Sequence, residues 1–232
     1  MNNIGDTGEN INFSIASRAM NIEPDKKQIK KFDEYAKQTT KFRNKLILVL
    51  LTILGLSIYL FVIGHWIWGS IVAVVGLLFM FFVVSINNTT VYKNGLIVPA
   101  IIIDINPIKI IALANMCSEE NQKLIWGCQK ITLKNLPNHK IEVGEKIPCV
   151  TMFGIAIDGY RRHFEPRPIS WGYKNPKYIT EVVDLITNDD ECPNFNNEWG
   201  ILENLTNTMK EFEKENEVVF FDENLNKVEM EK

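Results

Sequence analysis

Two apolar runs decide the fold: Leu46–Gly64, LILVLLTILGLSIYLFVIG, and Trp68–Ile86, WGSIVAVVGLLFMFFVVSI. Each run has 19 residues (64−46+1 and 86−68+1) and contains no Asp, Glu, Lys or Arg. A helix rises about 1.5 Å per residue, so each run nearly spans a hydrocarbon core of about 30 Å. Backbone groups inside a bilayer must be satisfied within the segment that crosses it. The sequence therefore predicts a two-helix transmembrane hairpin over residues 46–86.

Basic residues precede the first run. Residues 26–45 hold eight Lys and Arg residues against Asp33 and Glu34, whereas the turn at residues 65–67 carries no fixed charge. Positive residues stay on the cytoplasmic side of a membrane. An even number of spans returns the chain to the side from which it came. We therefore expect a multi-pass protein of the plasma membrane with both termini in the cytoplasm.

The residues before the first run divide into two predicted segments. Residues 1–25 are rich in Asn, Gly and Asp and show no apolar periodicity, which favours a disordered tail. Residues 26–45 carry Ile29, Phe32 and Ala36 at helical spacing, which predicts a basic amphipathic helix. This helix either lies flat in the headgroup layer or extends the first span into the cytoplasm.

Short β-like segments separated by Gly, Pro and Asn follow the hairpin. Five short strands with tight turns favour a small SH3-like or OB-like β-barrel over residues 87–175, with a curled open sheet as the alternative. The fold class is therefore a membrane α-hairpin plus an α+β cytoplasmic domain. The predicted strands are Thr90–Asn94, Leu96–Ile105, Ile108–Ala114, Gly127–Leu133 and Lys146–Phe153.

Residues 176–232 are predicted to form two helices and an acidic tail. Asn175 and Pro176 supply an N-cap and a first helical residue, and the apolar stripes of both helices are expected to pack on the barrel or on each other. EVVFF, residues 217–221, begins either a terminal hairpin or a frayed end. Thirteen acidic residues against four lysines beyond Asn188 exclude nucleic acid as a partner.

Signatures of catalysis are absent from the sequence, which lacks G-x-S-x-G, G-x-x-x-x-G-K-[ST], H-E-x-x-H and G-x-G-x-x-G. Cys117, Cys128, Cys149 and Cys192 form no C-x-x-C pair and have no His at ligand spacing, so no metal or cofactor is expected. The thiols are expected to pack as small apolar groups. His139 is predicted to be solvated in its turn.

The most distinctive stretch outside the membrane is FEPRPISWGY, residues 164–173, whose prolines favour an extended strap. In one interpretation, Phe164 and Trp171 plug the end of the barrel and clamp it to the following helix. In the other, basic and aromatic side chains meet a protein partner or a lipid headgroup, because Arg and aromatic residues commonly anchor interfaces. The candidate binding residues are then Arg161, Arg162, Phe164, Arg167, Trp171 and Tyr173.

Small residues gather on one side of the second span. Gly69, Ala73 and Gly76 allow a neighbouring helix to approach closely. That neighbour is either the first span of the same chain or, in a homo-oligomer, the second transmembrane helix of another copy. No polar residue in either span suggests an ion or substrate pathway, so a channel or transporter is not expected.

Four stretches stand out between residues 90 and 200: NGLIVPA at 94–100, WGCQK at 126–130, VGEKIPCV at 143–150 and FEPRPISWG at 164–172. Together they resemble a bacterial family of uncharacterised membrane-anchored proteins, a catalogued domain of unknown function. The resemblance implies the bacterial inner membrane and brings no activity or catalytic residues. The order of a membrane hairpin and a small barrel is more loosely similar to NfeD-like membrane proteins, which are thought to assist membrane-bound proteases and scaffolds.

The leading functional hypothesis is a non-enzymatic, membrane-anchored module that binds another protein at the cytoplasmic face as an adaptor or regulator, with the lipid bilayer as its other partner. The second hypothesis is an immunity protein whose acidic helical tail meets a basic toxin. The third is a membrane-associated enzyme that uses Cys149 or His163, and it has the least support.

Overall fold

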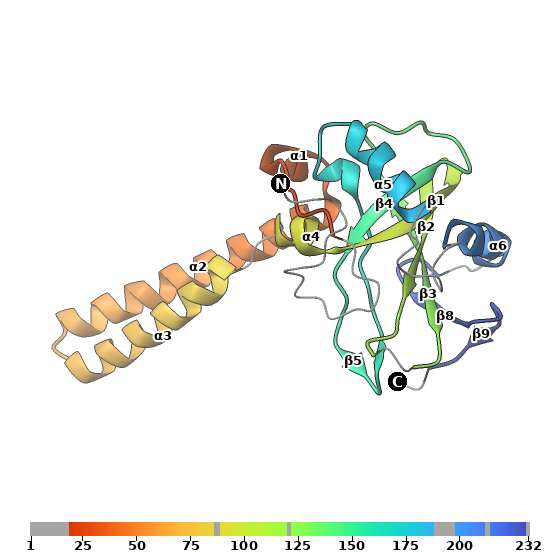
Figure 1. Cartoon of the computed structure of the whole chain (residues 1–232). Helices are drawn as coiled ribbons and strands as arrows, with labels where there is room; N and C mark the ends of the chain where they lie inside the picture. Colours follow the sequence, from red (N-terminus) through yellow and green to blue (C-terminus); the bar gives the residue numbers. More distant parts are fainter. Residues whose placement is uncertain (1–18, 86–88, 120–121, 188–197, 212–213, 231–232) are drawn as a thin grey trace. The chain divides into compact units, whose positions relative to one another are not determined.

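The computed structural model describes residues 19–85, 89–119, 122–187, 198–211 and 214–230. They belong to two compact units, coloured along the sequence in Figure 1. The hairpin unit comprises residues 33–88, and the sheet domain comprises the residues on both sides of it, 1–32 and 89–232. The hairpin unit is therefore an insertion into the chain of the sheet domain.

An antiparallel sheet of seven strands, in the order β7-β4-β1-β2-β3-β8-β9, forms the centre of the sheet domain (Figure 1). The middle strands are β4 (Lys146–Thr151), β1 (Leu96–Ile105), β2 (Ile108–Asn115) and β3 (Ile125–Leu133). The outer strands are β7 (Arg167–Pro168), β8 (Val218–Asp222) and β9 (Lys227–Val228). A separate two-stranded hairpin contains β5 (Ala156–Ile157) and β6 (Tyr160–Arg161).

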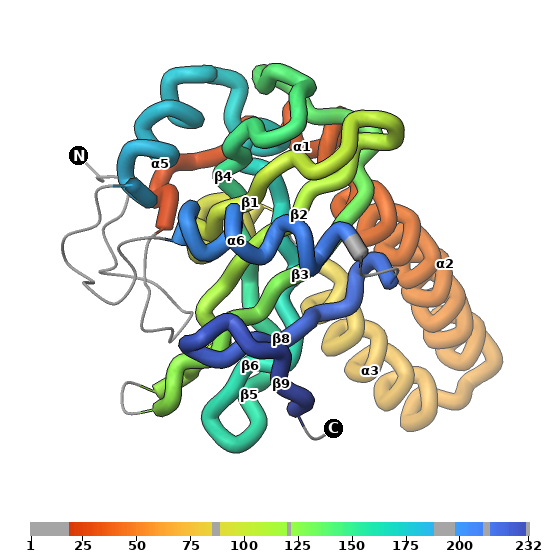
Figure 2. Tube along the Cα trace, turned by 90° about the vertical axis from the view of Figure 1, so that its right-hand side faces the viewer, coloured from red at the N-terminus to blue at the C-terminus, as the bar shows by residue number. Residues whose placement is uncertain are grey.

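The predicted SH3-like or OB-like barrel is wrong, because the sheet is open: β7 and β9 form its two edges and do not pair with each other. Two helices pack on the sheet, α5 (Lys177–Thr187) against β4 and β1, and α6 (Glu198–Glu211) against β1 and β2. Figure 2 shows α6 crossing the sheet. Helices bury the apolar side chains that a closed barrel would bury in its interior. The looser likeness to NfeD-like proteins loses the barrel, which was one of the features that supported it.

The two predicted C-terminal helices are confirmed, and so is the terminal hairpin. The Asn175 side-chain oxygen accepts a hydrogen bond from the Lys177 backbone N–H at 3.1 Å, as expected of a residue that caps a helix. The stripes of α5 and α6 are buried at Val182, Ile186, Trp199, Leu202, Leu205 and Met209. β8 and β9 form the terminal hairpin, and β8 also pairs with β3. The end of the chain thus widens the sheet.

Residues 90–94 form a helix rather than the predicted strand. α4 (Thr89–Asn94) is followed by Gly95, whose N–H donates to the Val91 carbonyl oxygen at 2.9 Å. β-Branched residues suggested a strand here, but such propensities yield to tertiary packing. Tyr92 is fully buried, and its ring packs edge-on against Tyr173 with centroids 6.4 Å apart.

The segment before the hairpin unit is part of the sheet domain. Asn21 N–H donates to the Lys93 carbonyl oxygen at 3.0 Å, and Asp25 N–H donates to the Gly172 carbonyl oxygen at 2.8 Å. The predicted disordered tail is therefore wrong for residues 19–25, while residues 1–18 lie outside the described residues. Helix α1 (Lys26–Phe32) also packs on this domain, against the 3-10 turn η1 (Ile169–Trp171).

Two long helices, α2 (Glu34–Val62) and α3 (Trp66–Ser85), form the hairpin unit and pack against each other. Both are long and apolar enough to be candidate membrane-spanning helices. Ser57 Oγ donates a hydrogen bond to the Gly69 carbonyl oxygen at 2.9 Å, which joins the two helices. Sequence analysis did not identify this contact.

The small-residue side of α3 packs on α2. A Cβ at Gly69 would lie 3.1 Å from the Phe61 ring, and a Cβ at Gly76 would lie 3.3 Å from Ile53 and Leu54. Of the two neighbours considered for this side, the structure therefore shows the first span of the same chain.

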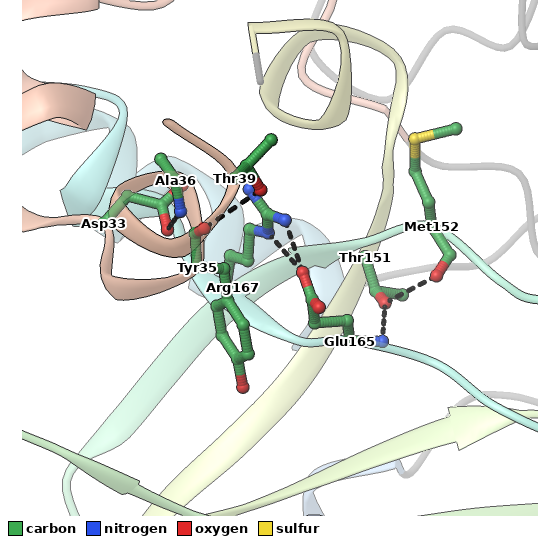
Figure 3. Close-up of polar contacts among 8 residues, drawn as sticks. All are labelled: Asp33, Tyr35, Ala36, Thr39, Thr151, Met152, Glu165 and Arg167. Atoms are coloured by element: carbon green, nitrogen blue, oxygen red, sulfur yellow. Dashed lines mark hydrogen bonds and ion pairs between the residues drawn. The ribbon is translucent and has the colours of Figure 1, made fainter. Parts of the chain in front are cut away.

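The predicted basic helix over residues 26–45 is interrupted at Asp33, between α1 and α2. Asp33 has an extended backbone (φ −66°, ψ 114°), and its carboxylate accepts a hydrogen bond from the Ala36 N–H at 2.8 Å (Figure 3). This bond caps α2. Residues 34–45 then continue directly into the first span as one helix, which was one of the two expected arrangements.

His139 lies in the connection between β3 and β4 and is not solvated as predicted. Its side chain is 0% exposed, and Nδ1 lies 3.5 Å from Glu145 Oε1. Burial lowers the pKa of His139 below its ordinary value, and the Glu145 carboxylate offsets part of that shift. The neutral imidazole is therefore favoured in the folded protein.

We expect Gly69→Leu to destabilise the hairpin unit, because the added side chain meets the Phe61 ring. Ser57→Ala should cost less, about 0.6 kcal/mol, for the lost interhelical hydrogen bond. Reversible unfolding of the full chain in mixed micelles measures both changes. Gly55→Leu is the matched control, since a Cβ at Gly55 meets nothing within 4 Å. Equal losses at Gly55 and Gly69 would contradict the packing described.

Stability should fall on acidification because of His139. The pKa of His139 is lower in the folded protein than in the unfolded chain, where it is about 6.5. The neutral imidazole therefore adds to the free energy of unfolding above about pH 6.5, and this contribution is lost as the pH falls through the folded pKa. Thermal unfolding of the full chain between about pH 7.5 and pH 5 tests this. His139→Leu should reduce the difference between the two midpoints. An unchanged pH dependence in this variant would refute the assignment.

Candidate binding site

The β5–β6 hairpin projects from the end of the sheet at which β2 and β3 are connected (Figures 1 and 2). Its two-residue turn contains Asp158 (φ 51°) and Gly159 (φ 80°). Positive φ at both positions is the geometry of a type I′ turn, which the sequence Asp-Gly favours. A Cβ at Gly159 would collide with the Gln122 side chain, so glycine is required there for close approach as well.

Hydrogen bonds to the β2–β3 connection hold the hairpin in place. Ser118 N–H and Oγ both donate to the Gly159 carbonyl oxygen, at 2.8 and 2.6 Å. Tyr160 Oη donates to the Lys123 carbonyl oxygen at 3.1 Å. The Arg161 backbone N–H donates to the Met116 carbonyl oxygen at 2.7 Å. The hairpin is thus fixed on one side before any ligand arrives.

Large aliphatic side chains on and beside this hairpin are exposed. Ile155 is 86% exposed, Ile157 49% and Met152 36%. Ile155 is the most exposed large apolar residue that the structure describes in the sheet domain. Exposed apolar side chains that cluster on a surface mark sites of interaction more often than scattered ones do.

Two of the predicted binding residues, Arg161 and Arg162, lie at the base of this hairpin and are half-buried. Arg161 Nη1 donates to the Gly154 carbonyl oxygen at 3.2 Å, and its guanidinium lies 5.7 Å from the centre of the Phe153 ring. Burial lowers the pKa of Arg161 from its ordinary value. Within the described part of the chain, Arg162 Nε and Nη1 are buried without a hydrogen-bond partner. Arg162 therefore has hydrogen-bond donors that no described residue uses.

The predicted aromatic residues do not belong to this surface. Phe164 and Trp171 are fully buried, and Tyr173 is 4% exposed. The Phe164 ring packs against Phe153 with centroids 6.1 Å apart, and Trp171 Nε1 donates to the Asn135 carbonyl oxygen at 2.8 Å. Of the two interpretations of residues 164–173, burial of Phe164 and Trp171 agrees with the structure, although no barrel is present, and exposed aromatic anchors do not.

Arg167 is also buried and has an internal partner. Its guanidinium donates to the Glu165 carboxylate, through Nε at 2.8 Å and through Nη2 (Figure 3). Glu165 N–H in turn donates to Thr151 Oγ1 at 2.9 Å. Arg167 thus fixes the strap beside β4, with which β7 pairs, and is not exposed for binding as predicted.

Groups suited to metal chemistry are not found among the described residues, where no three His, Cys, Asp or Glu side chains gather. Cys117, Cys128 and Cys149 are buried free thiols, and Cys192 lies outside the described residues. Burial raises the pKa of the Cys149 thiol above its ordinary value. Because the thiolate is the nucleophile, this environment disfavours covalent chemistry at Cys149.

Sequence analysis missed Ile155 and Ile157. The residues G-I-A-I-D-G, 154–159, contain a signal that could have located the hairpin, since Asp-Gly after alternating apolar residues is typical of a tight β-turn. Nothing in the sequence indicated that Ile155 and Ile157 would be exposed while Phe164 would be buried.

Comparison with known proteins agrees with the resemblance noted over residues 90–200. The family model described as "Protein of unknown function (DUF3239)" matches residues 85–209. The chain is also similar to a crystal structure described as that of a "putative membrane protein" from Corynebacterium diphtheriae, with 21% identity and a TM-score of 0.42, over 54% of this chain and 98% of the other. No curated protein matches. Because the family model covers 125 residues (209−85+1) of 232, the chain belongs to the DUF3239 family.

Proposed function

We propose that this chain is a non-enzymatic, membrane-anchored module of the bacterial inner membrane that binds another protein at the cytoplasmic face as an adaptor or regulator. The binding surface is the β5–β6 hairpin with Met152, Ile155, Arg161 and Arg162. The observation that carries the proposal is the exposure of Ile155 and Ile157 on a hairpin that is already fixed.

The rigidity of the hairpin supports this role. Binding costs less conformational entropy when a surface is ordered before the partner arrives. The hydrogen bonds from Ser118 and Tyr160 order this hairpin in advance. The exposed isoleucines supply apolar area, and the half-buried Arg162 supplies an unused donor. Such a mixture of apolar and Arg side chains is typical of interface centres.

Topology supports the cytoplasmic assignment. Residues on both sides of the hairpin unit fold into one domain, so they belong on the same side of the membrane. The eight basic residues between Lys26 and Lys45 favour the cytoplasmic side for that domain. Anchoring then raises the local concentration of the binding surface near membrane-bound partners.

We expect the double variant Ile155→Ser, Ile157→Ser to bind the partner at least tenfold more weakly, by roughly 1.4 kcal/mol or more. The reason is that each substitution removes apolar side-chain area that the partner would bury on binding. A photocrosslinker at position 155 in intact membranes should capture one discrete protein. Once identified and purified, that protein should bind the unchanged chain and bind the double variant more weakly.

Two exposed aliphatic residues elsewhere in the sheet domain provide the control. Ile105→Ser with Val143→Ser removes two exposed aliphatic side chains outside the hairpin, 49% and 56% exposed, and should leave binding unchanged. Crosslinks to lipid alone, or equal loss of binding in both double variants, would refute the proposed surface.

Labelling with a membrane-impermeant thiol reagent tests the topology. In a chain without its native cysteines, His65→Cys should be labelled from the periplasmic side in intact cells, because residue 65 lies between the two spans. Asn226→Cys should react only after the membrane is opened. Labelling of position 226 in intact cells would place the sheet domain outside the cytoplasm.

A further inference from the structure

An uncompensated set of positive charges lies on α2 just before its apolar part. We define the basic collar as Lys37, Lys41, Arg43 and Lys45. Within residues 33–88 the acidic residues are Asp33 and Glu34, both at the very start of α2. The collar side chains form no ion pair with any residue that the structure describes.

The lysines of the basic collar share one side of the helix. Lys37, Lys41 and Lys45 follow one another at intervals of four residues, and all three are exposed. Arg43 is half-buried, and its Nε is buried without a hydrogen-bond partner among the described residues. The collar therefore presents three exposed ammonium groups on one side of α2 and, on the opposite side, a guanidinium whose Nε has no acceptor among the described residues.

The packing of α2 against α3 fixes the position of the collar along the helix axes relative to the end of α3. Gly69 lies opposite Phe61, and Gly76 lies opposite Ile53 and Leu54. Continued along two antiparallel helices, this register brings Lys45 level with the last residues of α3. Both apolar stretches therefore end at the same level, which marks one boundary of the hydrocarbon core.

The collar residues rise from that boundary through the headgroup layer. At about 1.5 Å per residue, Lys41 lies about 6 Å and Lys37 about 12 Å beyond Lys45 along the helix axis. Each headgroup layer is roughly 5 to 8 Å thick. Lys45, Arg43 and Lys41 thus fall at the depth of lipid phosphates, and the backbone of Lys37 lies beyond the headgroup layer.

We propose that the basic collar binds anionic phospholipid headgroups around α2, with Lys37, Lys41 and Lys45 on one side of the helix and Arg43, as the donor to a phosphate, on the opposite side. The planar guanidinium fork matches phosphate geometry, and ammonium groups add attraction without directional demands. A lipid is favoured over an acidic protein segment because the helix that carries the collar is itself a candidate span. The site does not depend on the protein partner proposed above.

Lipid retention by the purified full chain tests this inference. The chain is held in a neutral detergent, supplied with phosphatidylglycerol or phosphatidylcholine of equal acyl chains, and examined by native mass spectrometry. We expect preferential retention of phosphatidylglycerol, which weakens as salt is added. Replacement of all four collar residues by Gln should reduce phosphatidylglycerol retention at least about tenfold.

Three further variants make the result specific. Lys37→Arg, Lys41→Arg and Lys45→Arg together keep the charge and should keep the preference, which excludes a folding defect as the cause of loss. Lys140→Gln, Lys174→Gln and Lys210→Gln together remove three exposed lysines of the sheet domain and should have no effect. Arg43→Lys keeps the positive charge but loses the planar guanidinium, and should weaken the retention of phosphatidylglycerol.

Several outcomes would overturn the inference. These are equal retention of both lipids, retention that survives the Gln replacements, and an equal loss in the sheet-domain lysine variant. Displacement of the lipid by water-soluble glycerophosphate at the same concentration would show a site for a free phosphate ester and would also refute it.

Discussion

The contact on which the rest of the structure depends joins the two chain segments that flank the hairpin unit. The Tyr173 hydroxyl lies 2.9 Å from the Ile22 carbonyl oxygen and 2.8 Å from the Tyr92 carbonyl oxygen, and shares its single proton between them. Ile22 precedes the hairpin unit and Tyr92 follows it. Burial raises the pKa of Tyr173, with the charge of Glu23 adding to the rise, so the hydroxyl remains a donor. A single buried side chain thus joins the two segments of the sheet domain between which the hairpin unit is inserted in the chain.

This closure links membrane topology to folding. A domain assembled from residues 19–32 and from residues after 89 cannot form unless both segments reach the same compartment. An even number of spans satisfies that requirement, and the interhelical bond from Ser57 to Gly69 helps the spans to pair.

Which large apolar side chains are buried and which are exposed explains where the candidate site lies. Trp171 and Phe164 fill the interior beside the open sheet, which has no closed barrel to bury them. The β5–β6 hairpin pairs separately from that sheet, and among the described residues no second layer covers Ile155, which is 86% exposed. The aromatic side chains that the sequence suggested as binding residues are therefore buried, and Ile155, which the sequence did not single out, is exposed.

The sequence by itself determined the two long apolar helices, strands β1 and β2 and the cap at Asn175, because apolar length and turn residues act over a few neighbouring positions. Tertiary structure alone decided the open sheet, the burial of His139, the helical turn at Tyr92 and the exposure of Ile155. The physical reason is that burial depends on which surfaces meet. β8 joins β3 across about 90 residues of chain, and no local pattern records such a pairing.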